Sequence, residues 1–330
     1  MELNGGTFYR LSSTFLSRSS PMPADLLSDI LTALHPSTQV VGALDLGGDW
    51  AISFPAHDGL KIFAIERGVA SLRVEGEPCP LVLEADDCVI LPSGRSFTLG
   101  REASFPAIEI GTIPEEIWRE RIATVGGGGG ALILAGHFGF TGLQTTMLLG
   151  GIPPILRLRD KTTQGRIRWV LDLMRGELAD GGPGSSSVIQ HLSYLLLVQT
   201  LRLYLQEGAN KTTGWLFALS DPQIARATKA IHAAPANQWT VERLASEAGM
   251  SRSKFAERFR SVTGSSPIDY LTRWRMTLAC RELVSNQTKV GAVASALGYS
   301  SEAAFTTAFS RVIGCAPKRY TKTALLQPNK

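Results

Sequence analysis

Two groups of polar residues near the C-terminus have the side-chain types that read DNA bases. Ser253, Glu257 and Arg260 recur at helical spacing, and Thr307 and Arg311 occupy a similar pattern about fifty residues later. Arg can donate two hydrogen bonds to guanine, Glu can accept one from cytosine, and a Thr methyl can touch thymine. Each group therefore fits one helix face in a major groove. The full predicted DNA-binding set is Arg252, Ser253, Lys254, Glu257, Arg260, Ser301, Ala303, Thr306, Thr307, Ser310 and Arg311.

An internal repeat accounts for the spacing of the two groups. Segment 241–270 aligns with segment 290–320, and one inserted residue separates two stretches of constant offset. Repetition of this kind indicates two copies of one supersecondary unit. The matched pairs are Ala245 and Ala294, Gly249 and Gly298, Phe255 and Phe305, Phe259 and Phe309, Gly264 and Gly314, Pro267 and Pro317, and Tyr270 and Tyr320.

Each copy is typical of a helix-turn-helix unit. Gly249 and Gly298 can end a first helix because glycine tolerates a positive φ. Ser251 or Ser300 is then predicted to cap the second helix. The two Phe residues of each copy lie one helical turn apart, which predicts that they face the core. The base-reading residues are left on the opposite face, where the first unit has the stronger readers.

The segment between the two units predicts one long helix over 267–285. Pro267 falls in its first turn, where a missing N–H costs little. At 1.5 Å per residue this helix is roughly 28 Å long, close to the ~34 Å of one DNA turn. It can therefore hold two recognition helices near successive major grooves. Arg273, Arg275 and Arg281 either reach phosphates from this helix or form a solvated face.

The charge distribution supports a nucleic-acid partner. The chain of 330 residues has a net charge of +4, but residues 221–330 hold 16 Lys and Arg against 7 Asp and Glu. The other 220 residues hold 17 against 22. A basic module on a mildly acidic body is typical of DNA-binding proteins, although a solvated basic surface would look the same.

The composition predicts a cytoplasmic, nucleoid-associated protein without a membrane partner. Four scattered cysteines without a CxxC pair suit a reducing compartment. The N-terminus lacks a secretory pattern, and no run of about twenty uninterrupted apolar residues occurs.

The N-terminal half predicts a β-barrel followed by helices. Segments between residues 40 and 110 alternate apolar and polar residues between Gly, Pro and Asp breaks. From about residue 113 the pattern predicts helix. The glycines at 126–130 are interpreted as a flexible loop, since no Lys and Ser/Thr follow them as in a phosphate-binding loop. The apolar helix 188–206 is either a core helix or a dimer interface.

The C-terminal segment resembles a known family at this point. WTVERLASEAGMSRSKFAERFRSVTGSSPIDYLTRWRM and VASALGYSSEAAFTTAFSRVIGCAPKRY closely resemble the DNA-binding domain of AraC/XylS transcription regulators, over nearly all of 221–325. The resemblance implies seven helices, with recognition helices near 251–262 and 301–312. It places base contacts at Ser253, Glu257, Ala303 and Thr307.

The N-terminal segment resembles the cupin-type sensor of a branch of that family. HDGLKIFAIERGVASLRVEG and LEADDCVILPSGRSFTL carry this looser resemblance. A cupin metal site could take His57 and Glu66, but Phe97 stands where a second motif would supply His. No metal and no cofactor is therefore predicted, and the barrel is expected to hold a small organic effector or nothing. The residues predicted to bind an effector are His57, Lys61, Phe63, Arg73 and Arg95.

Together these features predict an α+β multidomain chain, not an enzyme, that regulates transcription. The expected parts are a cupin-like barrel (1–112) with a helical appendage for linkage or dimerisation (113–210), and an all-α domain with two helix-turn-helix units (221–325). The expected partners are double-stranded promoter DNA and a small-molecule effector, with RNA polymerase if the protein is an activator; a homodimer is left open.

Two enzyme classes are the alternatives. A metal-dependent cupin enzyme fused to a DNA-binding domain would need a histidine cluster, but the five histidines are scattered. A DNA-repair alkyltransferase would need a reactive cysteine, whereas Cys280 and Cys315 lie within helical segments.

Overall fold

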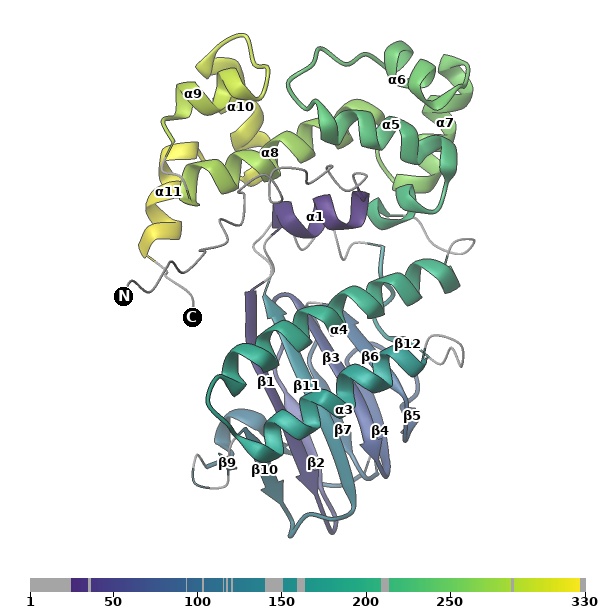
Figure 1. The fold of residues 1–330 in the computed structure, drawn as a ribbon, viewed down its shortest axis with the longest axis vertical. Coiled ribbons are helices and arrows are strands. Elements are labelled where there is room, and N and C mark those ends of the chain that lie inside the picture. Colours follow the sequence, from purple (N-terminus) through teal and green to yellow (C-terminus); the bar gives the residue numbers. More distant parts are fainter. Residues whose placement is uncertain are drawn as a thin grey trace, which may run out of the picture.

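The chain folds into a β-rich N-terminal body and a helical C-terminal body (Figure 1). The computed structural model describes residues 25–34, 37–92, 94–102, 104–114, 116, 118–119, 121–139, 151–158, 164–208, 214–285 and 288–326. The strands are β1 (Ser37–Leu46), β2 (Ala51–Phe54), β3 (Leu60–Arg67), β4 (Val69–Val74), β5 (Leu81–Glu84), β6 (Cys88–Pro92), β7 (Phe97–Gly100), β8 (Ile108–Glu109), β9 (Trp118–Arg119), β10 (Ile122–Val125), β11 (Ala131–Gly139) and β12 (Leu156–Leu158).

The strands form two sheets that pack face to face. One sheet has seven strands in the order β12-β6-β3-β11-β1-β10-β9, and the other has five in the order β5-β4-β7-β2-β8. A buried cluster that includes Phe54, Phe63 and Leu99 fills the space between them. This is the predicted cupin-like barrel.

Strand β3 shows how the sequence assigns residues to the two faces of the larger sheet. Leu60, Ile62 and Ala64 belong to the core beneath the covering helices. Phe63 and Ile65 belong to the barrel interior, so the alternating position Lys61 also points inward. The neighbouring β11 pairs antiparallel with β3, which sets His137 opposite Lys61 and Ala135 opposite Phe63.

The predicted change to helix at about residue 113 is wrong. Strands β9 to β12 follow that point, and β10 and β11 lie on either side of β1 in the larger sheet. The sequence of β11, ALILAGHFG, alternates with period two, but its Gly and Ala residues weaken the strand pattern. The glycines at 126–130 form the turn between β10 and β11, and the backbone N–H of Gly129 donates to Asp45 Oδ1 over 2.9 Å.

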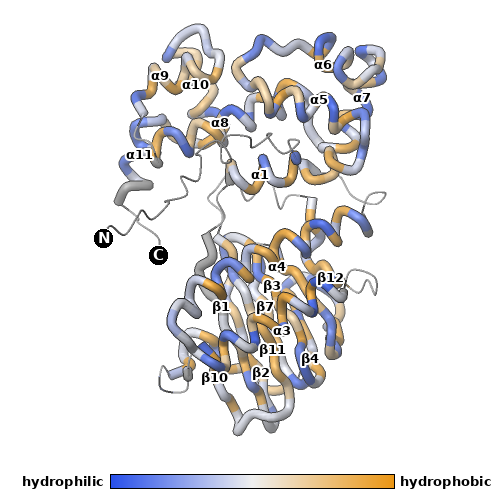
Figure 2. The backbone as a smooth tube through the Cα atoms, in the orientation of Figure 1, coloured by the Kyte–Doolittle hydropathy of each residue, from blue (hydrophilic) through white to orange (hydrophobic). Residues whose placement is uncertain are grey.

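Two antiparallel helices cover the outer face of the larger sheet (Figure 1). They are α3 (Gln164–Asp180) and α4 (Ser185–Gly208), and α4 contains the predicted apolar helix 188–206. Leu196, Leu197 and Leu201 of α4 are buried in the core, and Figure 2 shows the hydrophobic colouring along this helix. Arg175 of α3 forms an ion pair with Glu66 of β3. No helix within the described part of the chain is long and apolar enough to cross a membrane.

The C-terminal body has the seven helices that the family resemblance implied. They are α5 (Pro222–Ala233), α6 (Val241–Ala248), α7 (Arg252–Thr263), α8 (Pro267–Ser285), α9 (Val290–Ala296), α10 (Glu302–Ile313) and α11 (Pro317–Leu326). The long central helix, α8, has the predicted limits and separates the α6–α7 pair from the α9–α10 pair (Figure 1).

An N-terminal helix joins the C-terminal body. Helix α1 (Leu26–Leu34) precedes the barrel in sequence but packs against α5, α8 and the short 3-10 helix η4 (Trp215–Leu219) (Figure 1). Leu27, Ile30 and Leu31 are buried in the same core as Ile224 and Tyr270. The sequence pattern did not predict this contact, because a short amphipathic helix carries no information about its partner.

Candidate DNA-binding surface and barrel cavity

The first helix-turn-helix unit has defined helix ends. Helix α6 begins after Thr240, whose side chain accepts a hydrogen bond from the Arg243 backbone N–H over 3.2 Å. The helix ends at Gly249, which has the left-handed φ of 66° that favours glycine. Helix α7 begins after Ser251, as predicted, although this side chain accepts no capping hydrogen bond.

In the second unit, the observed N-cap of the recognition helix differs from the predicted one. The N-cap of α10 is Ser301, whose hydroxyl accepts from the Ala304 backbone N–H over 3.1 Å. The sequence repeat predicted Ser300 instead. The extra residue of the second unit lies in the turn, so the cap moves one position along the chain. Gly298 follows the end of α9 with a φ of 78°.

The paired phenylalanines hold both recognition helices against the core. Phe255 and Phe259 of α7 are fully buried, with ring centroids 5.5 Å apart. Phe305 and Phe309 of α10 are equally buried at 5.6 Å. The predicted helix phase is therefore confirmed, and the opposite face of each helix is free to contact a ligand.

The structure brings each predicted DNA-binding group onto one exposed helix face. On α7 the exposed residues are Arg252, Ser253, Lys254, Glu257 and Arg260. On or next to α10, Ser301, Ala303, Thr307 and Arg311 are exposed, while Thr306 and Ser310 are half-buried. The ion pairs of the described residues leave Glu257 and Arg260 unengaged, whereas Arg252 Nε pairs with Glu242 Oε1 at 2.6 Å.

A different arginine on α7 has a structural role. Arg258 Nε donates to Asp221 Oδ2 over 2.6 Å, and the Asp221 carboxylate is 7% exposed. Asp221 also accepts from the backbone N–H groups of Gln223 and Ile224, so it caps α5 and joins it to α7. Arg258 is thus directed away from the predicted reading set.

The loop between α5 and α6 links the two units. Arg275 of α8 donates to the Pro235 carbonyl over 2.7 Å and to the Asn237 carbonyl over 2.9 Å. Gln238 Nε2 donates to the Gly298 carbonyl over 2.9 Å. The Arg275 guanidinium also lies 5.4 Å from the centre of the Tyr299 ring. These contacts fix the orientation of the second unit relative to the first.

The arginines of α8 therefore do not act alike. Arg275 binds backbone carbonyls of the α5–α6 loop. It is therefore not part of a solvated helix face, one of the two roles that the sequence predicted for it. Arg273 pairs with Asp269 at 2.9 Å and Arg281 with Glu282 at 3.4 Å.

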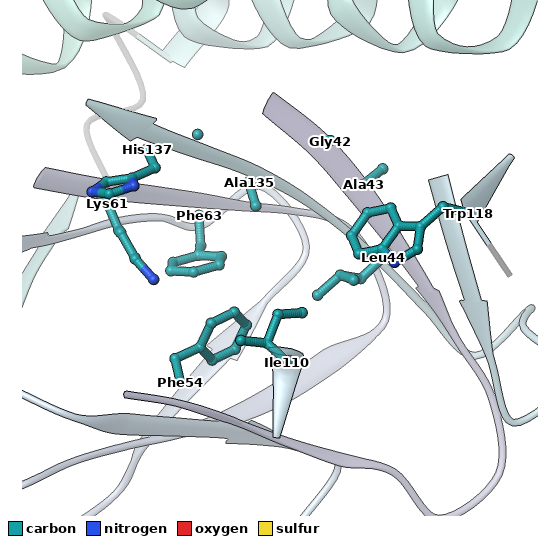
Figure 3. A pocket seen from close by; sticks show the side chains of 11 residues that line it. Gly42, Ala43, Leu44, Phe54, Lys61, Phe63, Ile110, Trp118, Ala135 and His137 are labelled. Carbon is teal, nitrogen blue, oxygen red and sulfur yellow. The ribbon is translucent and has the colours of Figure 1, made fainter. Parts of the chain in front are cut away.

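A second candidate site is a cavity of about 210 Å³ inside the barrel (Figure 3). Lys61 and Phe63, both predicted effector residues, line it, together with His137. The amine of Lys61 and the ring of His137 lie at one end of the cavity, and Leu44 and Trp118 lie at the other (Figure 3). The cavity therefore has a polar end and an apolar end.

The other predicted effector residues lie elsewhere. His57 adjoins the polar end, with its ring centroid 6.0 Å from that of His137. Arg73 is exposed on β4, where Leu72 and Val74 take the inward positions. Arg95 pairs with Glu77 at 2.6 Å. Strand alternation places Arg73 on the outer face, and neither arginine is among the residues that line the cavity.

Sequence reasoning missed the contributions of β1, β9 and β11 to this cavity. Trp118 and His137 follow the point at which helix was expected, so they were not assigned to the barrel. The period-two pattern of 131–139 was the available signal, since it aligns Ile133, Ala135 and His137 on one face.

Burial determines the protonation of the polar end. It lowers the pKa of His57 to about 4, with a further contribution from the Lys61 charge. Burial also lowers the pKa of His137 and of Lys61. At neutral pH the two imidazoles are therefore uncharged.

The described residues offer no metal site. No group of three or more His, Cys, Asp or Glu side chains among them could hold an ion. Glu66, one of the two considered ligands, lies 3.4 Å from Arg175. Glu66 and the inward-facing residues alternate along β3, so Glu66 is directed toward α3 rather than into the barrel.

Comparisons with known proteins agree with both halves of the chain. Residues 25–206 match the family described as Cupin, and residues 244–323 match the family described as helix-turn-helix domain. A putative AraC-like transcription regulator of Streptomyces antibioticus is 36% identical over 299 residues, which is 90% of this chain and 98% of that protein. The HTH-type transcriptional regulator AlkR of Acinetobacter baylyi is 29% identical over 305 residues, with the same two coverages. The solved DNA-binding domain of AdpA, in complex with a target DNA, is 35% identical over 32% of this chain and 95% of that one, with a TM-score of 0.31.

Proposed function

Since the chain belongs to the AraC-like transcription regulators that join a cupin domain to a helix-turn-helix domain, we propose that it binds a promoter through the exposed faces of α7 and α10. In this proposal α7 reads bases through Ser253, Glu257 and Arg260. Helix α10 contributes Ala303 and Thr307, whose small side chains suit thymine methyls, and Arg311, whose guanidinium suits a phosphate.

The arrangement of the two recognition helices carries the proposal. Each buries its Phe pair and exposes its polar face, and the two lie toward opposite ends of α8 (Figure 1). The 19 residues of α8 span roughly 28 Å, which suits recognition helices in successive major grooves about 34 Å apart.

The full chain is expected to select a DNA segment from around its own gene. Selection and footprinting at moderate salt should give a protected site of about two helical turns, since two units span successive grooves. Binding should weaken steeply as salt rises, because Lys and Arg contacts release counterions from the phosphates. Sequence-independent binding at every salt concentration would contradict the proposal.

Substitutions on the exposed face of α7 should alter base preference while leaving the fold intact. Glu257→Ala and Arg260→Ala are each expected to weaken operator binding by about ten- to a hundred-fold, the effect of one lost base contact. The measurement is affinity for the selected site and for its single-base variants.

Glu247→Ala is the matched control, because Glu247 is exposed on α6 and also carries one negative charge. It should leave the base preference unchanged. Unaltered preference in both α7 variants would remove α7 as the base-reading helix.

The barrel cavity is the effector site in this proposal. An effector can regulate DNA binding only if its affinity differs between two arrangements of the protein. The cavity lies behind the sheet that α3 and α4 cover, and Tyr204 of α4 packs against Phe217 of η4 in the C-terminal body. A conformational change in the barrel could therefore be transmitted to the C-terminal body through the contact between α4 and η4.

A homodimer through the outer helices forms part of the proposal. Trp169 is 58% exposed and Leu173 39% exposed one turn apart on α3, and Tyr194 of α4 is also exposed. Exposed large apolar side chains of this kind are enriched at interfaces. The stoichiometry of the footprinted complex distinguishes one bound chain from two.

A further inference from the structure

Lys61 occupies a position where an unpaired charge is costly. Its neighbours at the alternating positions of β3 are Phe63 and Ile65, both buried in the barrel core. None of the ion pairs of the described residues involves Lys61. Its Nζ lies instead 5.1 Å from the centre of the Phe54 ring and 5.4 Å from that of Phe97. Ring faces stabilise an ammonium group only modestly, so an anion would complete this site.

The groups around Lys61 supply hydrogen-bonding capacity without a competing charge. His137 is its cross-strand neighbour, and its Nε2–H donates to the Asp58 carbonyl over 2.6 Å. His57 Nδ1 is buried and has no hydrogen-bond partner among the described residues. The carboxylate of Asp58, which acts electrostatically on His137, belongs to an exposed residue. One ammonium without an ion-pair partner in the described part of the chain, at the end of an apolar cavity, matches a single small anionic group.

The rest of the cavity sets the size and polarity of the ligand body. Phe63, Leu44, Ile110 and Trp118 supply apolar surface, while Ala135 leaves room between strands. A cavity of ~150 Å³ with such a lining accommodates one benzene ring. The cavity of about 210 Å³ therefore has room for one ring, or its aliphatic equivalent, with a short substituent.

We propose that the barrel binds a compact apolar monocarboxylate, with the carboxylate on Lys61 Nζ and the hydrocarbon body between Phe63 and Trp118. The inference rests on the proposed role of the barrel as the effector site and specifies the chemistry of that effector. The carboxylate would replace the water that solvates the Lys61 amine, and the body would fill the apolar end.

Titration calorimetry on the full chain tests the proposal with matched acids and amides. The probes are cyclohexanecarboxylate and 3-phenylpropanoate, each compared with its uncharged amide. At least one acid is expected to bind at micromolar to millimolar concentration, and its amide at least about ten-fold more weakly, the effect of a lost charge-assisted hydrogen bond. Equal binding of acid and amide, or no binding of either acid, would overturn the proposal.

Two variants separate the role of Lys61 from a general effect of charge. Lys61→Met should reduce acid affinity at least about ten-fold and leave amide affinity nearly unchanged. Its melting temperature should be equal or higher, because the variant removes a half-buried charge that has no ion-pair partner among the described residues. Arg73→Met removes a cation from the outer face of β4 and should change neither affinity. Undiminished acid binding in a folded Lys61→Met variant would contradict the assignment.

The same preparation separates this inference from the proposed function. A chain that selects its DNA site but binds no acid would refute the ligand class and leave the DNA-binding function intact. A chain that binds an acid through Lys61 but selects no DNA site would refute the DNA-binding function and leave the ligand class intact.

Discussion

Phe305→Ala is expected to unfold the second helix-turn-helix unit and abolish binding to its half of the operator. Phe305 is fully buried, with its ring 5.4 Å from that of Tyr299 and 5.6 Å from that of Phe309. Truncation of a buried Phe to Ala costs about 3–5 kcal/mol, through lost transfer energy and the cavity that remains. The core of this unit is small, so the loss should exceed what its neighbours can restore by local repacking.

Hydrogen exchange of the full chain measures this loss unit by unit. Amides of α9 and α10 should lose protection, while those of β3 and β11 in the barrel should keep theirs. Ile268→Ala is the control, because Ile268 is a large apolar side chain on α8 that is 38% exposed. Protection of α10 in Phe305→Ala equal to that in the control would show that the Phe pair is not the core of this unit.

The C-terminal half could be predicted closely because its determinants are local and occur twice. Gly249 has the positive φ that its place in the repeat implied, and Pro267 begins α8 as predicted. The Phe spacing fixed the phase of α7 and α10, so the exposed faces followed without tertiary information. The helix caps differed in two ways: Ser251 precedes α7 without a capping hydrogen bond, and the cap of α10 is Ser301 because an inserted residue shifts the turn by one position.

The barrel could be predicted only in part because its strands pair across long sequence distances. Leu60–Arg67 alternates clearly, but its partner β11 is rich in Gly and Ala and follows a glycine-rich turn. Strand propensity depends on cross-strand packing, which a single sequence does not show. For the same reason Lys61 and Phe63 were recognised as cavity residues while Trp118 and His137 were not.

The contacts between the two helix-turn-helix units also join residues that are far apart in the sequence, so the sequence alone did not predict them. Arg275, Gln238 and Gly298 come from three separate segments, and each looks like a surface residue in its own segment. Their contacts hold the second unit against the α5–α6 loop. Recognition of two successive grooves requires a fixed angle between the units, so these residues should affect DNA binding without touching DNA.

Gly298→Ala is expected to disrupt this junction. A Cβ at Gly298 would lie 2.0 Å from the Ala236 carbonyl oxygen, which is backbone and cannot rotate away. The φ of 78° adds about 1–2 kcal/mol for any residue with a Cβ. The α5–α6 loop must therefore move, and the Gln238 hydrogen bond to the Gly298 carbonyl should be lost. We expect a total loss of stability of about 3 kcal/mol or more, in the range of strained backbone positions.

Gly314→Ala separates the clash from the backbone strain. Gly314 belongs to the same unit and has a φ of 85°, but a Cβ there would meet nothing within 4 Å. This variant should lose only the ~1–2 kcal/mol of the left-handed conformation and keep the full footprint. Gly298→Ala should lose more stability and protect only the half-site of α7, because the second recognition helix is no longer held in register. Equal stabilities and equal footprints for the two variants would mean that the α5–α6 loop can move away from the added Cβ at no measurable cost. The angle between the units would then be set by α8 alone.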